Sequence, residues 1–186
     1  MPFLSTLPDD ALVKDVYPIN PELFLPWCKV EEMIMRGESE LTAGERELIG
    51  AFTSALNGCT YCYSSHSEAA KFLGIDEQVF TDFLADPMKA PVREELRPIL
   101  AYVHKLTLKP ATMVQADADA VYAAGWSEKT LHDAIMVCCC YSFMNRLADG
   151  HGLPSDPALF KERGRRHADN GYFTQYAKEI GADESA

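Results

Sequence analysis

Apolar residues recur along most of this chain at intervals of three and four positions, which is the spacing of a helix with one buried face. One example is the set Leu48, Ala51, Phe52, Ala55 and Leu56. No stretch of useful length alternates apolar and polar residues as a half-buried β-strand does. The pattern therefore predicts an all-α protein.

Helix ends are marked by capping residues, glycine and proline. Thr42, with Glu45 three positions later, forms a capping box and predicts that a helix begins there. Gly37 and Gly74 are each expected to end a helix, because glycine suits the residue that follows the last turn. Pro98 should begin or kink its helix, since proline lacks the N–H that interior positions donate.

These signals predict a string of helices joined by short polar breaks. The first follows a lead-in that contains Pro18, Pro21 and Pro26. The predicted helices cover residues 27–36, 42–56, 59–73, 77–84, 94–106, 115–124, 127–149 and 157–165. The tail after residue 180 is expected to fray.

Length and composition fit one domain. With 186 residues, of which 47% are hydrophobic, the chain can bury a sizeable core. We expect a single helical domain over residues 1–186, with a motif-bearing core at about 41–74 and a second helical half at about 92–152.

Charge and hydropathy restrict the partners. A net charge of -11 opposes binding to nucleic acid and to anionic membrane surfaces. No apolar run approaches the ~20 residues of a membrane helix, and the N-terminal residues lack the pattern of a signal peptide. We therefore expect a cytoplasmic protein whose partners are small molecules or other proteins.

Cysteine usage points to reduced thiols. Six cysteines without a signal peptide do not indicate a disulfide framework. Cys138, Cys139 and Cys140 stand in an apolar stretch, where a thiol commonly serves as a small core residue. Only Cys59 and Cys62 have the spacing of a redox pair.

The stretch from Glu47 to His66 places a carboxylate, two thiols and an imidazole within twenty residues. A helix break at 57–58 puts Cys59 and Cys62 in the first turn of a new helix, where N–H groups and the helix dipole stabilise a thiolate. Cys62 and His66 share a helix face, and the two thiols are close enough to form a disulfide. The spacing predicts a dithiol redox unit in which one cysteine has a lowered thiol pKa.

This pattern resembles the active-site signature of the alkylhydroperoxidase D-like branch of the carboxymuconolactone decarboxylase superfamily. The signature is Glu, eleven residues, Cys-x-x-Cys, three residues and His, and Glu47, Cys59, Cys62 and His66 match it in type and spacing. Residues 93–149 resemble the second half of the family's peroxidase-related members.

One position departs from the family pattern. The residue before the second cysteine is often His in the family and is Tyr61 here. Whether Tyr61 or His151 takes part in a proton relay is therefore left open.

The resemblance implies thiol-dependent reduction of hydroperoxides, an antioxidant activity. Cys62 attacks the peroxide as a thiolate and becomes a sulfenic acid, and Cys59 resolves it to a disulfide. Glu47 orients His66 and tunes its basicity. No cofactor and no metal are expected, and the disulfide is reduced by an external dithiol protein, lipoyl-bearing or thioredoxin-like.

The chain is also expected to form a homo-oligomer. Large apolar residues on several helices exceed what one small bundle can enclose, namely Phe24, Trp27, Met33, Met35, Phe143 and Met144. Family members that it resembles form dimers or trimers of dimers.

Other interpretations of the motif stay open. A structural zinc site would need four ligands, and no second Cys-x-x-Cys or His pair has a suitable spacing. A thioredoxin-type motif would follow a strand rather than a helix. The pair could instead serve a redox-sensing or disulfide-exchange protein. A carboxymuconolactone decarboxylase-like lactone enzyme would have no use for the two thiols.

The remaining histidines lack metal-ligand spacing and are interpreted as structural or surface residues; they are His104, His132, His151 and His167. The basic cluster at 162–167 is interpreted as a solvated face or a subunit contact.

Overall fold

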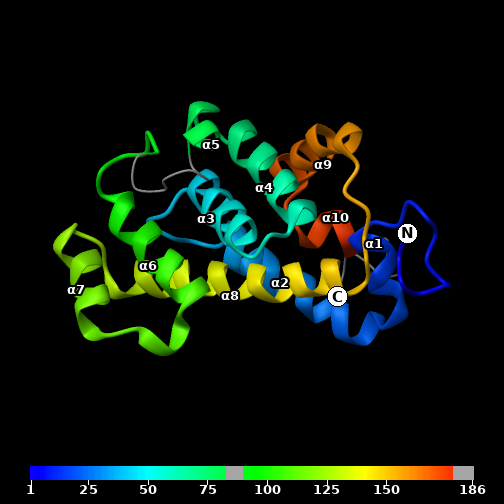
Figure 1. Ribbon diagram of the computed structural model, residues 1–186, viewed down its shortest axis with the longest axis horizontal. Helices are drawn as coiled ribbons and strands as arrows, with labels where there is room; N and C mark the ends of the chain where they lie inside the picture. Colours follow the sequence, from blue (N-terminus) through cyan, green and yellow to red (C-terminus); the bar gives the residue numbers. More distant parts are fainter. Residues whose placement is uncertain (83–89, 178–186) are drawn as a thin grey trace.

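The computed structural model describes residues 1–82 and 90–177, which form helices joined by short turns (Figure 1). No β-strand occurs in these two ranges, which confirms the all-α prediction. The α-helices are α1 (Val13–Val16), α2 (Pro21–Arg36), α3 (Ala43–Leu56), α4 (Thr60–Phe72), α5 (Gln78–Asp82), α6 (Leu96–Leu108), α7 (Gln115–Ala123), α8 (Glu128–Gly150), α9 (Pro157–Asn170) and α10 (Phe173–Ala177). Two 3₁₀ turns, η1 (Tyr17–Ile19) and η2 (Pro110–Thr112), complete the set. The predicted fraying after residue 180 and the end of the helix predicted over 77–84 lie outside the described residues.

The helix pair α3 and α4 forms the centre of the molecule. These two helices pack against each other, and α8 runs beside them and also contacts α2 and α6 (Figure 1). On its other side α4 packs along α9. Helix α3 is therefore enclosed from several directions.

The start of α3 has the predicted capping box. The Thr42 side chain accepts the Glu45 N–H at 3.2 Å, and the Glu45 carboxylate accepts the Thr42 N–H at 2.9 Å. From Gly44 to Ser54 every residue of α3 is buried, including its charged ones. A polar residue on this helix consequently lies in the core and needs a partner there.

The first long helix begins earlier than predicted. Helix α2 begins at Pro21 rather than at 27, and Pro26 lies inside it. The Asn20 side chain caps the helix by accepting the Leu23 N–H at 3.2 Å, and proline is well suited to the first helical position. Pro98 lies in the first turn of α6, as predicted.

The sequence pattern did not indicate the short helices near the two termini. Helices α1 and α10 were not predicted, and α9 continues to Asn170 instead of ending at 165. Helix α10 begins where the Glu32 carboxylate accepts the N–H groups of Tyr172 at 2.5 Å and Phe173 at 3.1 Å. Helices this short are marginal on their own, so a contact from α2 decides where the chain turns.

Apolar side chains remain exposed on α2 and α8. Met33 and Phe143 are exposed, whereas Phe24, Met35 and Met144 are buried within the chain itself. The homo-oligomer therefore stays a prediction that rests on fewer residues than the sequence indicated. In the described part of the chain, none of the helices has the length and apolarity needed to span a membrane.

Helix α9 approaches α4 closely at Gly164. A β-carbon at Gly164 would lie 2.8 Å from the backbone nitrogen of Ala69 and would also meet the side chain of Glu68. We expect Gly164→Ala to lower the free energy of unfolding by about 1–3 kcal/mol, as overpacking does. Chemical denaturation measures this change.

Gly150→Ala is the matched control, because nothing lies within 4 Å of a β-carbon built there. Alanine has the higher helix propensity at both positions, so only the steric clash distinguishes the two variants. Equal stability of the two variants would contradict the close packing of α9 on α4.

Candidate active site

The two candidate redox cysteines lie where α3 gives way to α4. Asn57 ends α3, and Gly58 turns the chain with a φ of 75°, a conformation that glycine adopts without strain. Cys59 is the N-cap of α4 and Cys62 is in its first turn, as predicted. Both are free thiols, and they are only 1% and 4% exposed.

Cys62 is not the cysteine with a lowered thiol pKa that the sequence predicts for one of the pair. Its pKa is raised well above the ordinary value, first by a hydrogen bond with the Cys59 thiol and then by burial and by the nearness of Cys59. A hydrogen bond from Asn145 and the charge of Arg163 oppose this but do not overcome it. In the dithiol state a base must therefore take the proton from Cys62 before it can react.

Asn145 of α8 binds the end of α3, just before the cysteines, and was missed in the sequence. Its Nδ2 donates to Ser54 Oγ at 2.9 Å, and its Oδ1 accepts from Asn57 Nδ2 at 2.9 Å. The same side chain stabilises the anionic form of Cys62. The only signal available was a buried amide in an apolar helix, because such a group needs hydrogen-bond partners.

His66 and Glu47 are brought together by the packing of α4 on α3. His66 Nδ1 lies 2.7 Å from Glu47 Oε2, and both side chains are buried. Burial alone would raise the pKa of Glu47, but the hydrogen bond with His66 and the charges of His66 and Arg36 outweigh it and lower the pKa to about 2. Because an ionised carboxylate can only accept, Nδ1 carries a proton, which leaves Nε2 as the ring nitrogen available to exchange a proton with another group.

The other oxygen of Glu47 is bound from two further elements. Arg36 Nη2 at the end of α2 donates to Oε1 at 2.5 Å, and the Tyr172 hydroxyl, just before α10, donates to it at 2.8 Å. Tyr141 of α8 donates in turn to the Tyr172 hydroxyl at 3.0 Å. Glu47 is thus a fully buried ion with a complete set of partners.

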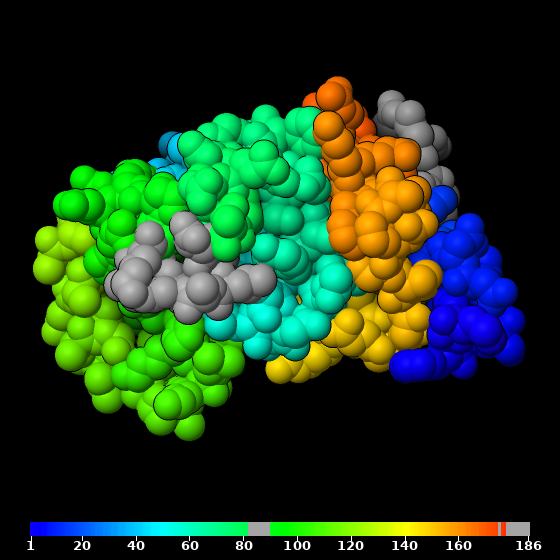
Figure 2. Space-filling view, turned by 45° about the horizontal axis from the view of Figure 1, so that its top comes forward, coloured from blue at the N-terminus to red at the C-terminus, as the bar shows by residue number. Residues whose placement is uncertain are grey.

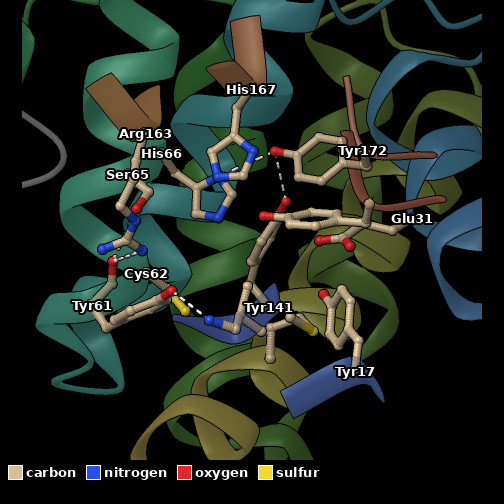
Figure 3. A pocket seen from close by; sticks show the side chains of 13 residues that line it. Tyr17, Glu31, Tyr61, Cys62, Ser65, His66, Tyr141, Arg163, His167 and Tyr172 are labelled. Atoms are coloured by element: carbon tan, nitrogen blue, oxygen red, sulfur yellow. Dashed lines mark hydrogen bonds between the residues drawn. The ribbon is translucent and has the colours of Figure 1, made fainter. Parts of the chain in front are cut away.

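A small cavity connects the thiol with this network (Figure 3). Cys62 and His66 both line it, with Tyr141 and Tyr172 on the opposite side. The His66 ring packs against Tyr141, with ring centroids 4.1 Å apart. The volume open to water-sized groups is about 20 Å³, enough for roughly one water molecule.

A second carboxyl group, Glu31, lines the same cavity. It is 2% exposed, and its Oε2 has no hydrogen-bond partner among the described residues. Burial, followed by the charges of Glu47 and Glu32, raises its pKa to about 8. Glu31 is therefore uncharged at neutral pH, in contrast to Glu47.

The interpretation of the basic cluster at 162–167 as a solvated face or a subunit contact is wrong for two of its members. Arg163 and His167 are 8% and 6% exposed and line the cavity. They are four residues apart on α9, so packing of α9 on α4 through Gly164 turns both inward. The His167 ring stacks on His66, with centroids 5.4 Å apart.

The other histidines stay away from the cavity. His104 stacks on Phe52, and His132 lines a surface groove between α2 and α8. His151, at the end of α8, makes a 2.7 Å hydrogen bond through Nδ1 to the Leu147 carbonyl. None of the three lines the cavity that holds Cys62.

Tyr61 is occupied by a structural contact. Its hydroxyl accepts the Val13 N–H at 2.8 Å, which ties α1 to α4. Burial raises the pKa of Tyr61 to about 12, against the opposing charge of Arg163. These contacts give Tyr61 an anchoring role.

Residues 1–82 and 90–177 contain no group of three or more His, Cys, Asp or Glu side chains placed to hold a metal ion.

The chain is similar to one known protein family and to solved structures. The sequence model of the Carboxymuconolactone decarboxylase family matches residues 21–85, a span that includes Glu47, Cys59, Cys62 and His66. No curated protein matches the sequence.

Two solved structures are similar to the chain. One is an uncharacterized peroxidase-related protein from Silicibacter sp. TM1040, with a TM-score of 0.74, 25% identity, and coverage of 82% of this chain and 80% of that one. The other is the alkylhydroperoxidase AhpD core of an uncharacterized peroxidase-related protein from Ralstonia eutropha JMP134. Its TM-score is 0.73 at 24% identity, with coverage of 81% and 78%, and it indicates the fold alone. Together with the family match, these findings confirm the resemblance to alkylhydroperoxidase D-like proteins.

The buried ion pairs of Glu47 predict a large stability effect. Glu47→Gln leaves the Arg36 guanidinium without its counter-charge, and we expect the free energy of unfolding to fall by about 3–5 kcal/mol at pH 7. Glu68→Gln is the control, because Glu68 pairs with Lys71 at the partly exposed surface, where such pairs contribute about 0–1 kcal/mol. Denaturant titration of both variants measures the difference, and losses of equal size would contradict the assignment.

Glu31 predicts a dependence of stability on pH. The unfolded chain releases this proton near pH 4.5, whereas the folded protein keeps it up to about pH 8. Between these values the folded state binds more protons, so this group makes stability fall as pH rises. Glu31→Gln removes the fall, and the stability of the variant relative to the original protein should increase from pH 5 to pH 8 by up to about 1.4 kcal/mol per pH unit.

Denaturation at pH 5, 6.5 and 8 measures this difference. His167, whose pKa burial and the nearby His66 lower to about 3, is present in both proteins, so its own contribution largely cancels. A difference between the two proteins that is constant over this range would refute the buried, protonated Glu31.

Proposed function

We propose that this chain, which resembles the alkylhydroperoxidase D-like proteins, is a thiol-dependent peroxidase that reduces hydroperoxides through a Cys59–Cys62 disulfide cycle. The observation that carries the proposal is a pair of free thiols at a helix start that shares a cavity with a buried imidazole–carboxylate pair. Antioxidant defence is the role that such an activity supports.

In the first step His66 acts as the base. The proton of Cys62 passes to His66 Nε2, directly or through a molecule held in the cavity, and Glu47 stabilises the imidazolium that forms. The thiolate attacks the distal peroxide oxygen, the O–O bond breaks, and the leaving alkoxide takes the proton from His66. Cys62 is oxidised to a sulfenic acid, and the peroxide is reduced to an alcohol or, for hydrogen peroxide, to water.

In the second step Cys59 resolves the sulfenic acid. Its sulfur attacks the sulfur of Cys62, a disulfide forms and water leaves, with the Cys59 proton carried on the departing oxygen. An external dithiol then exchanges with this disulfide and returns both cysteines to thiols, and its own sulfurs are oxidised to a disulfide. A lipoyl-bearing or a thioredoxin-like protein fits this requirement, and a cytoplasmic location would keep it reduced.

Burial of the two thiols has a consequence for the partner. Cys59 and Cys62 are 1% and 4% exposed, so a protein dithiol reaches their sulfurs only after the start of α4 opens. The small cavity likewise favours a peroxide with a narrow reactive end.

A second candidate function is redox sensing or disulfide exchange without peroxidase turnover. The raised pKa of Cys62 and its nearly complete burial fit a slow, single oxidation better than rapid turnover, because both slow attack on a peroxide. A lactone enzyme of the carboxymuconolactone decarboxylase type is less well supported, since decarboxylation would leave the thiol pair unused.

Cysteine variants separate these functions. We expect Cys62→Ser to abolish peroxide consumption in the presence of a small dithiol, and Cys59→Ser to allow one oxidation of Cys62 but no turnover. His66→Ala should slow the oxidation step by about 10²-fold or more, which is the usual contribution of a general base. Peroxide consumption and mass spectrometry of Cys62 provide the two readouts.

Cys139→Ser is the control, because Cys139 is an exposed thiol on α8, outside the cavity. Its activity should equal that of the original protein. Turnover in Cys62→Ser would overturn the assignment, and formation of a Cys59–Cys62 disulfide without catalytic peroxide consumption would favour the sensing function.

A further inference from the structure

A second, smaller cavity with a basic lining adjoins the one that holds Cys62. Four of the residues around it are basic, namely Lys14, Arg163, Arg166 and His167, and no acidic residue lines it. This is unexpected in a chain with a net charge of -11. The cavity lies where α9 meets the N-terminal segment, and Figure 2 shows these two parts side by side at one end of the molecule.

Two buried nitrogens at this cavity have no hydrogen-bond partner among the described residues. They are Nη1 of Arg163 and Nδ1 of His167. The guanidinium of Arg163 is fixed, because it stacks 3.6 Å from the Tyr61 ring centroid and its Nη2 donates to the Tyr61 carbonyl at 3.2 Å. A buried donor that stays unpaired costs about 1–3 kcal/mol, so an acceptor bound here would be stabilised from the start.

The charge state of His167 suits an anionic acceptor. Burial and the nearby His66 lower the pKa of His167 to about 3, so its imidazole is neutral at physiological pH. In the tautomer with the proton on Nδ1, it donates one hydrogen bond beside that of Arg163. A cationic and a neutral donor on adjacent turns of α9 therefore face the same space.

This cavity shares part of its lining with the one that Cys62 lines. Arg163 and His167 border both cavities, and Figure 3 shows them extending from α9 toward Cys62 and His66. The positive charge of Arg163 is felt at Cys62, where it favours the thiolate. An anion held by Arg163 would thus lie beside the cavity that Cys62 lines.

The two carboxyl groups near the adjoining cavity add little negative charge beside Arg163. Glu31 is uncharged below about pH 8, and Glu47 is paired with Arg36. The Asp15 carboxylate, which accepts the Leu12 N–H at 2.8 Å at the start of α1, is the acidic group whose charge reaches Tyr61 on the cavity wall. No acidic residue lines the cavity itself, so the buried Arg163 is the charge that would attract an anion.

We propose that this cavity is a carboxylate subsite, and that the peroxide reduced by this protein carries a carboxylate group. One carboxylate oxygen enters between Arg163 and His167, since the open volume of about 10 Å³ admits roughly one water-sized group. The hydroperoxide end of the molecule then reaches Cys62 through the adjoining cavity. The substrate class rests on the proposed peroxidase function, whereas the anion subsite does not.

Paired alkylating reagents test the subsite without any peroxide. Iodoacetate and iodoacetamide deliver the same reactive carbon, but only iodoacetate carries a carboxylate. We measure the ratio of their alkylation rates at Cys62 by peptide mass spectrometry, and the same ratio at the exposed Cys139 serves as an internal reference. We expect the Cys62 ratio to exceed the Cys139 ratio by roughly 10-fold, as one charge-assisted hydrogen bond allows.

Variants on α9 identify the source of this preference. Arg163→Gln should reduce the Cys62 ratio to that of Cys139. Any effect of this variant on the thiolate fraction of Cys62 cancels in the ratio, because both reagents react with the thiolate. Arg166 is half-buried on the cavity wall, and Arg166→Gln should reduce the Cys62 ratio partly. This variant leaves the stacking of Arg163 on Tyr61 unchanged. Arg165→Gln removes the same charge from the same helix, but Arg165 is exposed and lies over Phe72, so the ratio should not change.

A ratio at Cys62 no greater than at Cys139 in the original protein would overturn the subsite. So would an equal loss of preference in Arg165→Gln and Arg166→Gln, since that would indicate only a general effect of net charge.

The substrate class is tested with tert-pentyl hydroperoxide and its analogue in which the terminal methyl group is replaced by a carboxylate, 3-hydroperoxy-3-methylbutanoate. We expect the carboxylate form to be reduced about 10-fold faster at low concentration, with the preference lost in Arg163→Gln and Arg166→Gln. Equal rates would refute the carboxylate-bearing substrate. If neither peroxide is reduced while iodoacetate is still preferred at Cys62, the proposed peroxidase function fails and the anion subsite stands.

Discussion

The buried carboxylate of Glu47 is the group on which the rest of this structure depends. An ionised side chain with no exposure is tolerated only when charges and hydrogen bonds replace the lost water. Here Arg36, His66 and Tyr172 supply them, from the end of α2, from α4 and from the start of α10. The three segments therefore pack around one anion, and the contact that His66 makes with this anion also orients its ring.

Two carboxyl groups near one cavity are held in opposite states. Cationic partners keep Glu47 ionised, with a pKa of about 2, while burial without such partners keeps Glu31 protonated up to about pH 8. Environments that separate pKa values in this way are a common device for dividing acid and base roles. In this protein the division leaves one negative charge, already neutralised, beside a basic wall that can accept an anion.

The protonation state of Cys62 is likewise set by its neighbours. Cys62 is held as a thiol by Cys59 and by burial, while Asn145 and Arg163 are already placed to stabilise its anion. In the proposed peroxidase cycle, the thiolate therefore forms only once a base has taken the proton.

The sequence by itself determined the features that depend on residues close together in the chain. The helical period, the Thr42 capping box, the start of α4 at the cysteines and the common face of Cys62 and His66 are set within a few residues of each other, so local geometry fixes them. Only the tertiary structure decided that Arg36 and Tyr172 also bind Glu47 and that Arg163 and His167 turn inward. The Tyr172 hydroxyl reaches Glu47 across 125 positions, and Arg36 reaches the His167 carbonyl across 131. No periodicity records such contacts, because they arise from the way that α4 packs between α3 and α9 and from the turn that returns the chain to α2.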